Sequence, residues 1–258
     1  RRRFFPLYGL SALLSHPPSK FQLNMERTMK LFNAIQNKTN EYLNELIVCY
    51  VNIFEVQIKG IIEHKAVNEK TIEDFTRLFD AYLVACQSPK EFEKILLKAI
   101  VTAVDLMFMK KLLKRSNITF IDTLHWNSFC TCFNDNSSID LIFFPQAVRA
   151  LQMAQLIDQS HEEIQAICPN LSPQCVLQLL SIRKLDETLT QLPDIASFAQ
   201  TFELDPNSRD FDPNTLVNWN EMLLESYKDV NTEQWTDINV PTQIRIDFPL
   251  IGNFFNEL

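Results

Sequence analysis

The chain has 258 residues, a formal net charge of −8 and a pI of about 5.1, and hydrophobic residues make up 46% of it. This length is enough for a large buried core, and the acidic balance disfavours nucleic-acid binding, which needs a cationic face. The sequence contains only 3 glycines, and Gly60 is the single one between Leu10 and Ile251. Because glycine-rich loops bind nucleotide phosphates and glycine supplies tight hairpin turns, this scarcity favours helices and disfavours nucleotide-dependent enzymes.

The N-terminal segment is basic and then contains two consecutive prolines. Arg1–Arg3 resemble the charged start of a signal peptide, but no small-residue cleavage pattern follows before Pro17 and Pro18. We interpret residues 1–20 as a boundary segment or the fragment of a first helix within a longer protein. The sequence has no uninterrupted apolar run of ~18 residues, and its 6 cysteines lack zinc-site spacing, which predicts reduced thiols and a cytoplasmic location.

Helical periodicity dominates the first half of the chain. Residues 21–64 carry apolar side chains every three or four positions without a proline, which predicts one long helix or two helices joined near residues 37–40. A further helix is predicted over residues 71–86. Ser88 and Pro89 are typical of a helix start, and the helix that follows them through Leu113 is apolar nearly all round in its middle, apart from Thr102 and Asp105. We expect this helix to be central and packed on more than one side.

The second half contains shorter predicted elements. Residues 116–140 have the least regular pattern, and residues 134–138 and 205–213 are typical of loops. Ser172 and Pro173 mark the start of one helix, and the predicted helices span residues 145–157, 162–167, 175–182, 195–202 and 216–227. We therefore predict an all-α fold: an elongated body of packed antiparallel helices over residues 21–240, and an extended tail, residues 241–258, packed on that body.

Residues 210–221 resemble a calcium-binding loop in the spacing of their oxygen-bearing side chains. The position that requires glycine is occupied by Thr215, however, and Pro213 follows Asp212 directly. We favour an interpretation in which Asp212 caps a helix whose first residue is Pro213. The sequence therefore predicts no metal site here.

Two other arrangements resemble catalytic sites. His161, Glu162 and Glu163 match part of a zinc-binding helix, but no second histidine lies four residues further on. His125 and Cys130 could supply a base and a nucleophile, but no third group or oxyanion donor is visible beside them. We predict no catalytic residue, no cofactor and no enzymatic activity.

A basic cluster ends the predicted central helix. Lys110, Lys111, Lys114 and Arg115 could bind an acidic partner or a phospholipid headgroup. Cations near the C-terminus of a helix also complement its dipole without any partner. Both interpretations stay open, and the cluster is the candidate partner-binding site.

Three stretches follow one another in an order and spacing that match a known family over residues 25–200. Residues 43–64 form a long apolar helix that ends in Ile62-Glu63-His64, residues 79–115 end in the basic cluster, and residues 145–180 begin with Pro145-Gln-Ala and contain Cys168-Pro-Asn-Leu-Ser-Pro-Gln. Together they resemble the dilute (DIL) domain, which occurs in the globular cargo-binding tails of class V myosins and in related junction adaptors.

The resemblance implies an elongated helical body whose C-terminal segment wraps back along it. It also implies a non-enzymatic interaction domain that binds cargo-adaptor proteins or peptides, or a small GTPase complex, in grooves between helices. Such a domain would be cytoplasmic, would link vesicles or organelles to a cytoskeletal motor, and would reach membranes only through its partners. The alternatives are a helical-rod subunit of a vesicle-tethering complex, a small-GTPase-linked junction adaptor, and a helical enzyme with a site between helices.

Overall fold

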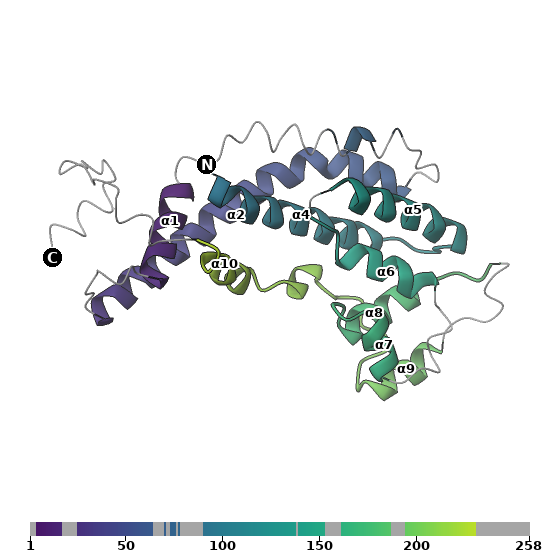
Figure 1. The fold of residues 1–258 in the computed structure, drawn as a ribbon. Helices are drawn as coiled ribbons and strands as arrows, with labels where there is room; N and C mark the ends of the chain where they lie inside the picture. The colour runs from purple at the N-terminus through teal and green to yellow at the C-terminus, as the bar shows by residue number, and fades with distance from the viewer. Residues whose placement is uncertain are drawn as a thin grey trace.

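The computed structural model describes residues 4–16, 25–63, 70, 73–75, 77, 90–137, 139–152, 161–186 and 194–230. These residues form an all-α fold, as the sequence predicts (Figure 1). Among them the only extended pairing is an isolated parallel bridge between Ile118 and Arg183. The predicted helix over residues 71–86 and the predicted tail over residues 241–258 lie largely or wholly outside the described residues.

The longest element is α2 (Met25–Glu63), which contains 39 residues. At ~1.5 Å per residue it is about 58 Å long. The helix is continuous, so the first of the two sequence interpretations is confirmed. At the expected junction, the Thr39 hydroxyl donates a hydrogen bond of 2.8 Å to the Ile35 carbonyl, which satisfies the buried hydroxyl without breaking the helix.

The central helix α4 (Lys90–Leu112) runs beside α2 in the same direction (Figure 1). Lys111, near the end of α4, forms an ion pair of 2.6 Å with Glu55, and Arg115 donates to the Ile62 carbonyl at the end of α2. The antiparallel packing expected from the sequence therefore does not hold for this pair.

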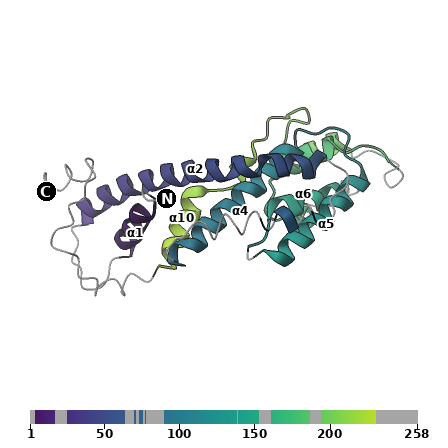
Figure 2. The ribbon, with the colours of Figure 1, turned by 90° about the horizontal axis from the view of Figure 1, so that it is seen from above.

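Two helices from opposite ends of the chain pack where α2 and α4 diverge. In Figure 2, α10 (Trp219–Tyr227) lies between the N-terminal halves of α2 and α4, beside α1 (Phe4–Ser15). Asn220 accepts a hydrogen bond from Asn40, and the Tyr227 ring lies 6.4 Å from the Phe32 ring, so α10 is antiparallel to α2. Residues 4–15 thus form a helix that packs on the body.

The helix α5 (Phe120–Asn136) lies where the sequence predicted the least regular part of the chain. That prediction was wrong because serine, threonine, asparagine and cysteine interrupt the apolar pattern, and these residues have low helix propensity. A capping box starts the helix: the Thr119 side chain accepts from the Asp122 N–H, and the Asp122 carboxylate accepts from the Thr119 N–H at 2.9 Å. Tertiary packing on α6 stabilises the rest.

The remaining helices are short and form the other end of the body. They are α6 (Phe143–Gln152), α7 (His161–Ile167), α8 (Pro173–Ser181), α9 (Ile195–Thr201), and the 3₁₀ helix η2 (Pro213–Leu216) that precedes α10. The predicted start of α8 is confirmed, because the Ser172 side chain accepts from the Cys175 N–H and Pro173 occupies the first turn. From α9 the chain returns along α4 through η2 to α10.

A phenylalanine cluster fills the core between α2, α4, α5 and α6. Each of its rings is at most 2% exposed. The rings of Phe108 and Phe144 stack with centroids 4.7 Å apart, and Phe108 also lies 5.2 Å from Phe129. The phenylalanine cluster consists of Phe54, Phe75, Phe108, Phe129, Phe133 and Phe144.

Candidate functional site

The predicted basic cluster is only partly available to a partner. Lys111 is used in the ion pair with Glu55, whose pKa is lowered mainly by that hydrogen bond. The guanidinium of Arg115 donates to the Ile62 carbonyl and lies 5.6 Å from the centroid of the Trp126 ring. Both side chains therefore join α4 to its neighbours. Cations at the end of this helix act in tertiary contacts as well as on the dipole.

Lys110 and Lys114 are the two exposed members of the basic cluster. Among the described residues, neither ammonium group forms an ion pair. A binding role for the cluster stays a prediction, and it now depends on these two lysines. Screening by salt would limit such exposed charges to a modest contribution each.

The loop that resembles a calcium site is organised as two helix caps. The Asp212 carboxylate accepts from the Asn214 N–H at 3.0 Å and starts η2 with Pro213 in its first turn, which confirms the capping interpretation. The Asn218 side chain accepts from the Glu221 N–H and starts α10 three residues later than predicted. Within the described part of the chain, no group of three or more histidine, cysteine, aspartate or glutamate residues is placed to hold a metal ion.

The cysteine suggested as a nucleophile lies inside the core. Cys130 is 4% exposed, and burial raises the pKa of its thiol well above the usual range. Burial also raises the pKa of Cys168 to about 11. Because the thiolate is the reactive form, both side chains behave as small apolar groups at neutral pH. The side chains of His161 and Glu162 lie outside the described residues.

Asp105, the polar exception in the predicted central helix, is a buried cap for another helix. Its carboxylate accepts backbone N–H groups from Ile142 (2.6 Å), Phe143 (2.7 Å) and Phe144 (2.8 Å) at the start of α6. Burial raises the pKa of this carboxyl to about 6, and the three N–H groups oppose that rise. Asp105 thus satisfies the free donors of α6 and joins α6 to α4.

Arg183 is a second buried charge whose partners are mainly backbone groups. Its guanidinium donates to the carbonyls of Leu151, Ile118 and Lys184 at 3.1, 2.9 and 2.9 Å. It also forms an ion pair of 2.7 Å with Asp186, whose carboxylate accepts from the N–H at the start of α5. These contacts join the start of α5 to the ends of α6 and α8, which is a structural role.

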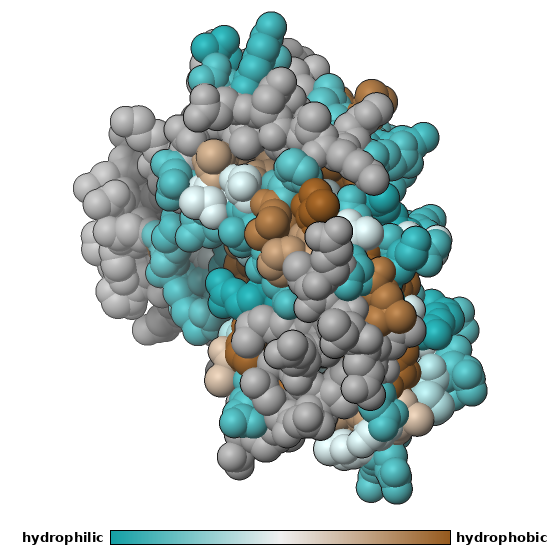
Figure 3. Space-filling model, turned by 90° about the vertical axis from the view of Figure 1, so that its right-hand side faces the viewer, coloured by the Kyte–Doolittle hydropathy of each residue, from teal (hydrophilic) through white to brown (hydrophobic). Residues whose placement is uncertain are grey.

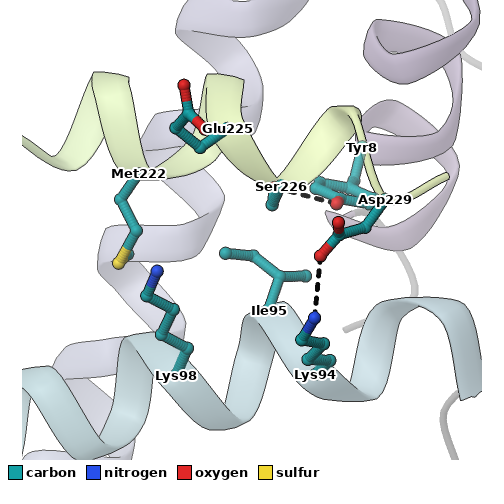
Figure 4. Close-up of a pocket in the computed structure, with 8 residues that line it drawn as sticks. All are labelled: Tyr8, Lys94, Ile95, Lys98, Met222, Glu225, Ser226 and Asp229. Atoms are coloured by element: carbon teal, nitrogen blue, oxygen red, sulfur yellow. Dashed lines mark hydrogen bonds and ion pairs between the residues drawn. The ribbon is translucent and has the colours of Figure 1, made fainter.

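A surface pocket of about 190 Å³ opens between α4 and α10, with α1 at one end (Figure 4). We call it the α4–α10 pocket. Its apolar lining consists of half-buried Met222 and of the edges of Ile95 and Tyr8, which are 3% and 1% exposed. The Tyr8 hydroxyl donates to the Ser226 hydroxyl at 2.9 Å, and burial raises the pKa of Tyr8 to about 12. The tyrosine is therefore a neutral part of the pocket wall at physiological pH.

Four charged side chains surround this pocket. Lys94 and Asp229 form an ion pair of 2.9 Å across it, and the hydrogen bond from Lys94 lowers the pKa of Asp229. In Figure 4 the Glu225 carboxylate points away from the space between the helices, whereas the Lys98 side chain extends toward Met222. The α4–α10 pocket therefore combines an apolar wall with an available ammonium group.

Almost nothing in the sequence predicts this pocket. Its residues come from three helices, and Tyr8 and Ser226 are 218 positions apart. One local signal exists, because Lys94 and Lys98 are four residues apart and therefore share one face of α4. Such a pair is usual on any exposed helix, so it points to no site by itself.

Exposed apolar side chains lie near the start of α5. Ile121 and Leu124 are 62% and 46% exposed, and Leu185 is 46% exposed. The hydrogen bond of 2.6 Å between the Phe120 N–H and the Asp186 carboxylate brings these two segments together. Figure 3, which views the molecule from the right-hand side of Figure 1, shows apolar groups at the surface among hydrophilic ones.

Comparison of the chain with known proteins identifies no relative. No protein-family model, no curated protein and no solved structure matches the chain. Within the described residues, no helix has both the length and the apolar composition needed to cross a lipid bilayer.

Proposed function

We propose that this chain is a non-enzymatic interaction domain of the dilute type, which binds cargo-adaptor proteins and links vesicles or organelles to a cytoskeletal motor. The return of the chain to its starting point is the observation that carries the proposal. Tyr8 in α1 donates to Ser226 in α10, so the first and last described helices lie together. The resemblance implies a body whose later segment returns along it, and α10 returns to α1 in this way, while the predicted tail over residues 241–258 lies outside the described residues.

The positions of the three similar stretches also support the proposal. The stretches that resemble the dilute domain contribute to α2, α4, α6 and α8 in chain order. Many of their apolar residues are buried: Leu43 and Leu96 are 1% exposed, and Leu151 and Leu177 are fully buried, although Val48 and Val56 on α2 are 57% and 76% exposed. The resemblance therefore concerns mainly residues that build the core. Binding residues would lie on the surface around this scaffold, where sequence changes with the partner.

Two surfaces on this scaffold suit protein partners. The α4–α10 pocket combines apolar and charged groups, and the start of α5 exposes Ile121 and Leu124. Exposed aliphatic side chains next to ordered polar groups are typical of transient protein interfaces. Such surfaces are what adaptor binding requires of a helical scaffold.

Affinity purification with the 258-residue chain tests the proposal. We expect mass spectrometry of the bound fraction to identify vesicle or organelle adaptors, and we expect one of them, once purified, to bind the chain directly in calorimetry. The same chain carrying Asp105→Ala, which should be strongly destabilised, is the control for adaptors that bind only the folded chain. Recovery of sibling tether subunits would instead support the tethering alternative. Turnover by the purified chain in hydrolase or transferase assays would overturn the non-enzymatic assignment.

A further inference from the structure

We propose that the α4–α10 pocket binds a partner peptide through one carboxylate side chain and an adjacent aliphatic side chain. This inference rests on the proposed function, because it names the chemistry of the partner segment that such a domain would recognise. The site is formed by side chains of α1, α4 and α10 and by Asp229 just after α10, and it needs no group outside the described residues.

The charges around the pocket favour an anion. Lys94 is neutralised by Asp229 at 2.9 Å, and Glu225 is neutralised by Lys228 at 2.6 Å. Among the described residues, no ion pair or hydrogen bond involves the ammonium group of Lys98. The Lys98 ammonium acts on Asp229 only through its charge, which adds to the hydrogen bond from Lys94 in lowering the pKa of that carboxyl. Within the described residues the N–H donors of Lys98 therefore remain available to an incoming anion. An incoming carboxylate would complete the arrangement with a charge-assisted hydrogen bond.

The apolar wall favours an aliphatic neighbour of that carboxylate. Ile95 and the Tyr8 ring form a buried floor, and Met222 lies beside Lys98 in Figure 4. A methionine side chain adapts to ligands of different shape, because its thioether chain is flexible and polarisable. An aliphatic side chain of the peptide would bury its surface against these three groups.

The size of the pocket favours peptide side chains over a cofactor. Its volume of about 190 Å³ is smaller than the roughly 300–1,000 Å³ typical of sites for drug-sized ligands. The pocket is also open to solvent along the groove between α4 and α10, so the peptide backbone can remain outside (Figure 4). One acidic and one aliphatic side chain fit these dimensions.

A pair of short peptides tests the inference directly. The first probe is an acetylated octapeptide with a leucine–aspartate–leucine centre flanked by serine and glycine, and the second has asparagine in place of the aspartate. We expect the first peptide to shift the amide NMR signals of Tyr8, Ile95 and Met222 of the 258-residue chain. We expect the asparagine peptide to bind about tenfold more weakly, since it lacks the charge.

A matched pair of lysine variants locates the charge that is recognised. Lys98→Gln removes the proposed contact, and Lys59→Gln removes another exposed lysine, on α2, whose partner Glu63 lies 3.9 Å away. We expect Lys98→Gln to weaken the aspartate peptide about tenfold and Lys59→Gln to leave its affinity unchanged. Equal binding of the two peptides, or equal affinity of the two variants, would overturn the inference.

Failure of the inference and failure of the proposed function give different results. If the wild-type chain and Lys98→Gln capture the same adaptors to the same extent, the pocket is not their binding site, and the adaptor function stands. If the aspartate peptide binds in the pocket but the chain captures no adaptor, the pocket chemistry stands, and the adaptor function is wrong. Binding that moves only signals outside the pocket contradicts the inference in either case.

Discussion

The two ends of the molecule both have aromatic cores, but they differ in how many of their buried polar groups form hydrogen bonds. At the phenylalanine end, where the phenylalanine cluster lies, the carboxylate of Asp105 is paired with three backbone N–H groups. At the tyrosine end, formed by α1, α10 and the start of α2, the rings of Tyr8 and Tyr227 lie 5.1 Å apart and carry hydroxyl groups into the interface. The first core is apolar, and the buried charges Asp105 and Arg183 beside it are paired, whereas the second core is mixed.

The difference appears in the pairing of the hydroxyl groups. Tyr8 donates to Ser226, but the buried hydroxyls of Ser11 and Tyr227 have no hydrogen-bond partner of acceptable geometry among the described residues. Burial strongly raises the pKa of Tyr227, and the nearby Ser11 hydroxyl opposes that rise only in part. Unpaired buried hydroxyls cost free energy, so we expect local opening to begin at the tyrosine end. The following variants test this contrast.

The largest effect is expected for Asp105→Ala. The change leaves the N–H groups of Ile142, Phe143 and Phe144 buried without an acceptor, and it removes the join between α4 and α6. We expect the free energy of unfolding to fall by about 4 kcal/mol. Urea unfolding followed by circular dichroism measures it. Asp140→Asn is the control, because Asp140 is exposed and lies in the loop just before α6. It should alter the free energy of unfolding by less than about 0.5 kcal/mol.

A slightly smaller loss is expected for Arg183→Met. The methionine keeps the aliphatic volume but removes the guanidinium donor from the carbonyls of Leu151 and Lys184 and the ion pair from Asp186. The Ile118 carbonyl also loses this donor but keeps the Lys184 N–H at 2.9 Å. We expect a loss of about 3 kcal/mol in the free energy of unfolding. Arg183→Lys should recover only part of it, because an ammonium group cannot reproduce the planar geometry of the guanidinium. Full recovery by lysine would show that charge alone matters here.

Asp105 also makes stability depend on pH. Its pKa rises from 3.8 to about 6 on folding, so the folded state binds the proton more tightly than the unfolded state. The resulting stability is complete below pH 3.8 and is lost as the pH rises through about 6, by about 3 kcal/mol in total. Carboxyl ¹³C NMR of Asp105 gives the midpoint directly. A midpoint near 4 would mean that the three N–H groups outweigh burial.

The smallest effects distinguish the two tyrosines. Tyr8→Phe removes the paired hydroxyl and should cost about 1 kcal/mol, since Ser226 loses its donor. Tyr227→Phe removes an unpaired hydroxyl and should leave the free energy of unfolding unchanged or raise it slightly. Thermal unfolding of both variants checks the difference. Equal losses would mean that Tyr227 has a partner in solution, such as a bound water.

Local structure was the part that could be predicted from the sequence. Ser172 and Asp212 cap helices as expected, each with proline next, because capping depends on residues within one turn. The helix α5 was missed because its capping box, Thr119 with Asp122, precedes residues of weak helix propensity, and packing on α6 supplies the missing stability. Helix propensity is a local property and does not include stabilisation by tertiary packing.

Long-range arrangement was the part that could not be predicted. The parallel course of α2 and α4 depends on contacts such as Lys111 with Glu55, which no local pattern encodes. The α4–α10 pocket joins Tyr8 to Ser226 across 218 positions of the chain, so its residues share no motif. Asp105 was visible as a polar residue in an apolar helix, but its partners at the start of α6 were not.

The position of α10 between α2 and α4 has a consequence for synthesis of the protein on the ribosome. The phenylalanine cluster needs residues only up to Phe144, whereas the tyrosine end needs Tyr227 to contact Tyr8 and Phe32. The nascent chain can therefore pack one core early, while the apolar sides of α1 and α2 remain uncovered until α10 has been synthesised. During that interval a chaperone could occupy the place that α10 eventually takes.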